Sequence, residues 1–172
     1  MRDFITARDY GLMRRVHAWE PPRWFQVWML GATRGGDGWL WVVAGALVLL
    51  FGGPERFLVA EVAGLAAGAG VVLFLILKRL TGRRRPCAIA PHVWCTLLPP
   101  DQFSFPSGHS ITAFAVAVSL AVAYPAAAPL LLFCAASVAA SRIVLGMHFL
   151  SDVLAGSILG VLLAFASWSL LS

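Results

Sequence analysis

The amino-acid sequence predicts an all-α, polytopic membrane helical bundle of about five transmembrane helices, preceded by an N-terminal interfacial amphipathic helix. Two observations predict this class. Hydrophobic residues make up 60% of the 172 residues and the mean hydropathy is +0.83, well above the values typical of soluble domains. These residues also gather in stretches long enough to cross a bilayer, separated by short segments rich in Pro, Gly and Arg.

Five stretches are predicted to span the membrane. A span needs about 20 apolar residues, and about 17 suffice when the flanking residues adapt. Small residues inside the stretches, such as Gly64, Gly156 and Gly160, leave room for close contact between helices. Prolines lie between the stretches, where a helix can end without a broken hydrogen-bond ladder. The predicted spans are residues 38–53, 57–77, 108–124, 128–147 and 151–171.

Residues 1–36 differ from the rest and are predicted to form a basic amphipathic interfacial segment, followed by a transmembrane domain over 37–172. Arginines alternate with apolar residues in this segment, and an aromatic run follows two prolines, a pattern typical of a helix lying in the membrane interface. Residues 22–33 could form a further span, but about 12 residues are too few to cross a bilayer. No signal-peptide pattern opens the chain, so we expect the N-terminus to be retained.

The charge of the chain favours an anionic partner at the membrane. The net charge is +5, from 13 Lys and Arg against 8 Asp and Glu, and Lys78 is the single lysine. Arginine binds phosphate in a planar, bidentate manner. Because the arginines lie at the edges of spans rather than on one soluble face, we expect anionic lipid head groups or a phosphorylated substrate as partners, and no nucleic acid.

The three cysteines form neither a disulfide framework nor a metal-binding pattern. Cys134 lies in an apolar run and is interpreted as a small core residue. Cys87 and Cys95 share one loop and could form a disulfide if that loop faces an oxidising compartment.

Ionisable residues gather where the predicted spans meet one face of the membrane. Since successive spans alternate in direction, the ends of the second and fourth spans and the starts of the third and fifth lie at the same face. A charged side chain at membrane depth costs at least about 2.5 kcal/mol, so such residues indicate a site with partners. The residues concerned are Lys78, Arg85, His109, Arg142, His148 and Asp152.

The spacing of these residues suggests phosphate chemistry. Asp152 follows His148 by four positions, so its carboxylate can orient the ring if the helix continues through the junction. Ser107 is a good N-cap and Gly108 allows close backbone approach, so free N–H groups beside His109 can hold an oxyanion. Zinc is the alternative ligand, but short ligand spacings are missing and the surrounding cations would repel a metal. A phosphoryl group accounts for all of these features.

Three motifs carry a resemblance to a known family. "KRLTGRRRP" (78–86) has Lys, six residues and Arg-Pro; "PSGH" covers 106–109; "SRIVLGMHFLSD" (141–152) has Ser-Arg, five residues, His, three residues and Asp. In this order they resemble the type 2 phosphatidic acid phosphatase superfamily, which includes lipid phosphate phosphatases and undecaprenyl pyrophosphate phosphatases, and more distantly glucose-6-phosphatase and vanadium haloperoxidases. The resemblance covers about residues 57–171.

The resemblance implies a role for each matched residue. His148 would be the nucleophile that forms a phosphohistidine, Asp152 would orient it, and His109 would be the general acid. The phosphate oxygens would be bound by Lys78, Arg85, Ser107, Gly108 and Arg142. The family works without a metal or organic cofactor. Arg79, Arg83 and Arg84 fall outside the motif positions, and we interpret them as attracting head groups or pyrophosphate.

The resemblance predicts an integral-membrane, metal-independent lipid phosphatase that acts on a lipid phosphate or pyrophosphate, such as undecaprenyl pyrophosphate, phosphatidate or phosphatidylglycerophosphate. A lipid-phosphate phosphotransferase and a non-catalytic anionic-lipid binding or transport protein are the alternatives. We expect the bacterial inner membrane as location. The basic N-terminal arm would place the site in the cytoplasm by the positive-inside rule, whereas the resemblance favours an extracytoplasmic site, which we adopt. The sequence predicts no particular oligomeric state.

Overall fold

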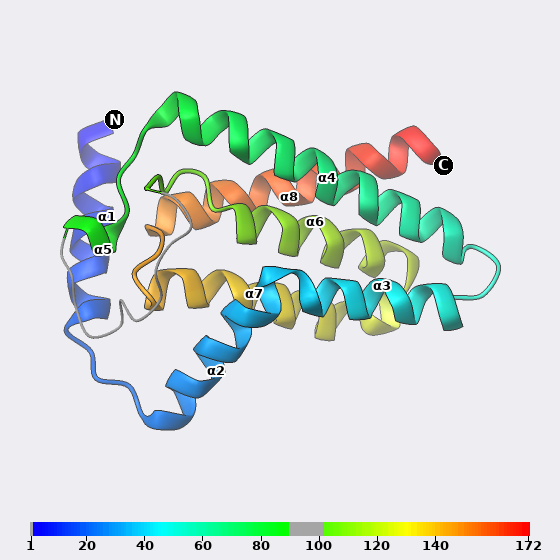
Figure 1. The fold of residues 1–172 in the computed structure, drawn as a ribbon, viewed down its shortest axis with the longest axis horizontal. Helices are drawn as coiled ribbons and strands as arrows, with labels where there is room; N and C mark the ends of the chain where they lie inside the picture. Colours follow the sequence, from blue (N-terminus) through cyan, green and yellow to red (C-terminus); the bar gives the residue numbers. More distant parts are fainter. Residues whose placement is uncertain (1, 90–101) are drawn as a thin grey trace.

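The computed structural model describes residues 2–89 and 102–172, and these fold almost entirely into helices (Figure 1). They contain no strand, and their one β-type contact is an isolated bridge between Arg84 and Phe103. The predicted all-α class is confirmed. In chain order the elements are α1 (Arg2–His17), α2 (Arg23–Arg34), the π-helical turn η1 (Gly35–Trp39), α3 (Leu40–Phe51), α4 (Arg56–Thr81), α5 (Pro86–Ile89), α6 (Gly108–Ala123), the 3₁₀ turn η2 (Pro125–Ala127), α7 (Ala128–Val144) and α8 (Leu150–Leu171).

Four helical segments among the described residues are long and apolar enough to cross a membrane, and α6, with 16 residues, is a shorter apolar helix. Large apolar side chains such as Leu47, Val72 and Phe165 are exposed on these helices, which suits contact with lipid. The chain is an integral membrane protein. The four segments are Arg23–Phe51, Arg56–Thr81, Pro125–Val144 and Leu150–Leu171.

The first span begins earlier than the predicted stretch 38–53. The helical run Arg23–Phe51 contains α2, η1 and α3, and it is kinked in η1 at Gly38, where the backbone is not helical. Arg34, Asp37 and three glycines interrupt the hydropathy in the middle of this run, which is why its two halves were predicted separately. The boundary expected at residue 36 falls inside the run, and an interfacial role remains a prediction for α1.

Helix α6 lies at the centre of the bundle, packed against α4, α7 and α8. It can approach α8 closely because small residues line the contact. A Cβ atom built on Gly160 of α8 would lie 2.4 Å from the carbonyl oxygen of Ile111 in α6, which is closer than real Cβ atoms approach. Gly156 and Gly160 therefore allow the close helix contact predicted for them.

The four helix ends predicted to meet do lie at one end of the bundle. Figure 1 shows the end of α4, the start of α6, the end of α7 and the start of α8 on the left, with α1 running across them. The loop between α3 and α4 lies at the opposite end. This arrangement gathers the polar residues of the helix ends around a common space.

Candidate active site

A cavity of about 490 Å³ opens at the end of the bundle where these helix ends meet. Its volume lies within the range of small-molecule sites, about 300–1,000 Å³. Three cationic side chains line it, Lys78, Arg85 and Arg142, and none is more than 8% exposed. Because cations held this close together and away from water repel one another, the cavity favours an anionic ligand.

Most of the predicted site residues surround this cavity. The lining residues include Lys78, Arg85, Gly108, His109, Arg142 and His148. Ser107 and Asp152 are not among them: both are fully buried in the structure behind the cavity. The first group is therefore placed where a ligand in the cavity could contact it, whereas the roles of Ser107 and Asp152 remain predictions. The further described lining residues are Gly36, Asp37, Phe74, Leu75 and Thr112.

His148 lies in the loop between α7 and α8, and its contacts define its tautomer. Its Nε2 is 3.1 Å from Nη1 of Arg85, and its Nδ1 is 2.6 Å from the carbonyl oxygen of Ser104. A guanidinium can only donate and a carbonyl can only accept, so Nδ1 carries the proton and Nε2 the lone pair. Burial, reinforced by the charges of Arg85 and Arg142 and opposed only in part by Asp152, lowers the pKa of His148 to about 3. Nε2 is thus an unprotonated, nucleophilic nitrogen at neutral pH.

Asp152 contacts His148 differently from the prediction. Helix α7 ends at Val144 and α8 begins at Leu150, so His148 and Asp152 do not share one helix. Oδ2 of Asp152 lies 3.7 Å from Nδ1 of His148, longer than a hydrogen bond, and accepts instead from the N–H of Phe149 at 2.9 Å. The backbone carbonyl of Ser104, which no motif singles out, is the closer acceptor. Asp152 acts on the ring through its nearby charge.

Arg83 lies behind the site rather than facing a head group as predicted. Its Nη1 donates to Asp152 at 2.6 Å and its Nη2 donates to Asp9 of α1 at 2.6 Å, while the guanidinium lies over the ring of Phe149. Asp9 is 5% exposed and accepts from the N–H of Ser151 at 3.1 Å and from its hydroxyl at 2.5 Å. A carboxylate at the N-terminus of α8 also complements the helix dipole. Asp9 therefore fixes α1 to the start of α8.

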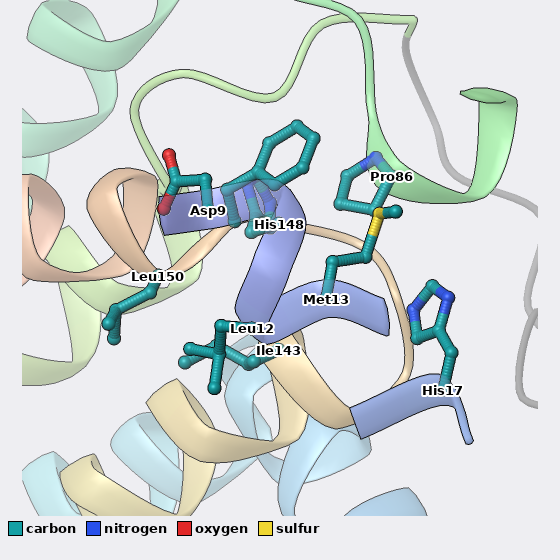
Figure 2. A pocket seen from close by; sticks show the side chains of 9 residues that line it. Asp9, Leu12, Met13, His17, Pro86, Ile143, His148 and Leu150 are labelled. Carbon is teal, nitrogen blue, oxygen red and sulfur yellow. The ribbon is translucent and has the colours of Figure 1, made fainter. Parts of the chain in front are cut away.

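Helix α1 covers the back of the His148 ring, as Figure 2 shows from close by. Asp9, Met13 and His17 of α1 lie around a small cavity that His148 and Pro86 also line. The cavity measures about 10 Å³, which is room for about one water molecule. The covering helix thus keeps bulk water away from the side of the ring that faces away from the cationic cavity.

His109 lies in the first turn of α6, whose N-terminus faces the cationic cavity. Ser107 caps this helix as predicted, since its hydroxyl accepts from the N–H of Ser110 at 3.4 Å. The N–H groups of a first helical turn have no acceptor inside the helix, and Gly108 and His109 line the cavity, so this turn can bind an anion. Nε2 of His109 is 2.8 Å from Oδ1 of Asp37, a residue not predicted for the site.

Several supporting residues were not found from the sequence. Nη1 of Arg142 donates to the hydroxyl of Thr33, which is buried in α2. Weak signals do exist: Thr33 is a polar residue in an apolar run, Asp37 is flanked by glycines, and Asp9 is acidic within a basic segment. None of these three signals is specific without the fold. Among the described residues, no three His, Cys, Asp or Glu side chains are grouped closely enough to hold a metal ion.

Cys87 is disulfide-bonded, and Cys95, with which the sequence suggested a bridge, lies outside the described residues. Cys134 is a free, partly buried cysteine on α7 that packs against the hydrophobic core, as predicted.

Comparisons with known proteins identify relatives of this chain. Residues 58–172 match the model of the PAP2 superfamily. The decaprenylphosphoryl-5-phosphoribose phosphatase of Mycobacterium tuberculosis is 36% identical over 124 residues, which are 72% of this chain and 66% of that protein. The lipid A 1-phosphatase of Rhizobium johnstonii is 30% identical over 148 residues, 74% of this chain and 58% of that protein. The chain thus spans less than two thirds of the length of either relative.

A solved structure also resembles almost the whole chain. The crystal structure of a transmembrane PAP2 type phosphatidylglycerolphosphate phosphatase from Bacillus subtilis superposes with a TM-score of 0.72 at 27% sequence identity. The match covers 96% of this chain and 85% of that one. It therefore includes α1, α2 and α3, which lie before the residues matched by the family model.

Proposed function

The chain belongs to the PAP2 superfamily, and from this premise and the geometry of the site we propose that it is a membrane-embedded phosphatase. It removes a terminal phosphate from a lipid phosphate or pyrophosphate through a phosphohistidine on His148. One observation carries the proposal: Nε2 of His148, unprotonated and buried, lies in a cavity that Lys78, Arg85 and Arg142 line with positive charge. Binding an anion would need the cations but not a nucleophile among them.

The first step is attack by Nε2 of His148 on the phosphorus. Arg85, which donates to Nε2 in the free enzyme, lies within reach of a phosphate oxygen placed at that nitrogen. Lys78 and Arg142 line the same cavity and stabilise the charge on the other phosphate oxygens. The N–P bond forms as the bond from phosphorus to the leaving oxygen breaks. Nδ1–H stays bonded to the Ser104 carbonyl and keeps the ring in place.

His109 supplies the proton that the leaving oxygen needs. It lines the same cavity, in the first turn of α6, and as an imidazolium it gives the proton from Nε2 as the leaving group departs and becomes a neutral ring. A water molecule then attacks the phosphohistidine, the N–P bond breaks, and His109 takes a proton from that water. The net reaction consumes one water and releases the lipid alcohol, or lipid phosphate, and inorganic phosphate.

The relatives guide the choice of substrate, and a disulfide guides the choice of the membrane side on which the site lies. The two curated relatives are named as phosphatases of a decaprenylphosphoryl phosphoribose and of lipid A, so a phosphate on a lipid-linked sugar is one candidate substrate class here. A disulfide at Cys87, beside the site residue Arg85, favours an oxidising and therefore extracytoplasmic compartment. We propose the bacterial inner membrane with the site on its outer side.

Phosphate release from a lipid panel tests this function. The purified full chain is supplied with phosphatidate, phosphatidylglycerophosphate and undecaprenyl diphosphate in EDTA, and inorganic phosphate is measured. We expect release with at least one lipid, and a loss of at least about 10³-fold in His148→Ala, since the covalent route is removed. Trapping with ³²P-labelled lipid should label the wild type and not this variant.

Two results would contradict the proposal. If the wild type binds the lipids but releases no phosphate from any of them, the cationic cavity is a binding site only. If His148→Ala, shown to be folded by its thermal unfolding, releases phosphate at the wild-type rate, another group is the nucleophile. Transfer of the label to an added alcohol instead of water would favour a phosphotransferase.

A further inference from the structure

One carboxylate stands in the cationic cavity, and the mechanism above does not use it. Among the described lining residues, Asp37 is the only acidic one. Its Oδ1 lies 2.8 Å from Nε2 of His109, the nitrogen proposed above as the proton donor. The Asp37 side chain is 45% exposed and that of His109 is 23% exposed, whereas Arg85 and Arg142 are almost fully buried. Asp37 thus stands at a more exposed part of the cavity than these two cations.

The backbone around Asp37 is shaped to place it there. Asp37 belongs to the turn η1 between α2 and α3, where the sequence is Gly-Gly-Asp-Gly. A Cβ atom on Gly36 would lie 2.6 Å from Cγ1 of Val138 and 3.2 Å from Cδ2 of His109, so only glycine lets the turn come this close. Gly38 has φ +122°, which other residues rarely adopt. The turn therefore holds Asp37 against His109 by two separate steric requirements.

The position of this carboxylate coincides with the place of the leaving group. If Nε2 of His109 protonates the leaving oxygen, that oxygen must come within about 3 Å of Nε2. The carboxylate oxygen already occupies a position at that distance. A substrate must displace it from Nε2, and because the turn is anchored against α6 and α7, Asp37 then stays beside the leaving group.

We propose that Asp37 determines specificity for the leaving group, and that it selects phosphate monoesters of hydroxylated lipid head groups over lipid diphosphates. A carboxylate accepts hydrogen bonds from neighbouring hydroxyl groups of a sugar or glycerol. It repels a leaving group that is itself a phosphate, as in a diphosphate. An alcohol also leaves as a strong base and needs the proton of His109, whose positive charge the neighbouring Asp37 carboxylate balances, whereas a phosphate leaves readily without a proton. All three effects favour the same substrates.

This inference rests on the proposed function and is tested with two lipids that share their tails. Dioleoyl phosphatidylglycerophosphate has a leaving group with a free hydroxyl, and dioleoylglycerol pyrophosphate has a phosphate as leaving group. The purified full chain in detergent with EDTA hydrolyses each, and kcat/KM is measured for both. We expect the wild type to favour the glycerophosphate. In Asp37→Asn the ratio of the two kcat/KM values should shift towards the diphosphate by at least about 10-fold.

Two further variants separate specificity from structure. Asp37→Glu keeps the charge and should retain most of the wild-type preference. Glu55→Gln removes an exposed carboxylate from the loop between α3 and α4, at the far end of the bundle, and should leave the ratio unchanged. A change in the ratio of two substrates is not produced by loss of folded protein, which lowers both rates in parallel.

The outcomes distinguish this inference from the proposed function. An active wild type that favours the diphosphate overturns the inference, and this needs no variant. The inference is also overturned if kcat/KM of the Asp37→Asn variant falls equally for both substrates. The same holds if the ratio of the two kcat/KM values changes by less than about twofold, since removal of a charge contact predicts a change of about tenfold. In each of these cases the phosphatase function stands. Absence of phosphate release from every lipid by the wild type overturns both.

Discussion

Replacing Gly156 of α8 with alanine should displace the start of α6, which carries His109, because the two helices are in close contact there. A Cβ atom at this position would lie 2.6 Å from the carbonyl oxygen of Ser107 and 3.1 Å from Cβ of Ser110. Ordinary contact begins at about 3.4 Å, so the start of α6 must move away by about 0.8 Å. The atom in the way belongs to the backbone, so a side-chain rotation cannot relieve the contact. His109 follows Ser107 by two residues and must move with it.

The expected losses of stability and of activity follow from this displacement. Overpacking of this kind destabilises by about 1–3 kcal/mol, and a shift near 1 Å at a reacting group lowers kcat by up to about 100-fold. Thermal unfolding in detergent and phosphate release from a responsive lipid measure the two quantities. Gly64→Ala is the matched control, because a Cβ atom there meets nothing within 4 Å on the exposed side of α4. Wild-type Tm and activity in Gly156→Ala would refute the reasoning, since the start of α6 would then not depend on this contact.

Three further predictions concern groups around the site. Asp9→Ala removes the carboxylate that joins α1 to Arg83 and to α8, and it should lower both kcat and the stability, the latter by about 2–3 kcal/mol; an unchanged Tm would contradict this. Folding lowers the pKa of His148 from 6.5 to about 3, so the free energy of unfolding is not reduced by this residue above pH 6.5 and decreases as the pH falls from 6.5 towards 3. At pH 5 the free energy of unfolding of the wild type should be lower by about 2 kcal/mol for this reason. The His148→Asn variant should not show this decrease, and unfolding measured at each pH tests the difference. Thr33→Val removes a hydrogen-bond acceptor of Arg142 and should raise KM about 10-fold with little change in Tm. A decrease of about 10-fold in kcat with an unchanged KM would count against a role of this contact in substrate binding.

The cationic and histidine side chains that line the cavity could be predicted because each stands out in an apolar chain. Lys78, Arg142 and His148 lie next to long hydrophobic stretches, where a charged or polar side chain is costly and therefore informative. The alternating direction of the spans was enough to bring them to one face. No knowledge of side-chain packing was needed for this step, since the topology alone decides which helix ends are neighbours.

The residues that hold the lining residues in place could not be predicted. Arg142 contacts Thr33, and Asp9 contacts Ser151, across 109 and 142 positions of the chain. A single sequence contains no sign of such pairs, because each depends on how α1 and α2 dock on the bundle. The orientation of His148 was predicted from helical spacing to Asp152, but the chain leaves the helix after Val144 and turns the ring towards a backbone carbonyl. Backbone carbonyls are present at every position and are invisible to motif reasoning.

The two histidines differ in burial, and this difference indicates how the site divides its tasks. His148 is 2% exposed, and a backbone carbonyl and a closed network through Asp152 and Arg83 to Asp9 hold it, so its environment stays the same for any substrate. His109 is partly exposed, and its partner Asp37 is more exposed still. A nucleophile always meets the same phosphoryl group, whereas a general acid meets whatever leaving group the lipid supplies. Substitutions of Asp9 should therefore reduce turnover of all substrates by a common factor, whereas substitutions of Asp37 should change the order of preference among substrates. If substitutions at both positions reduced turnover of all substrates by a common factor, the two networks would not be separate.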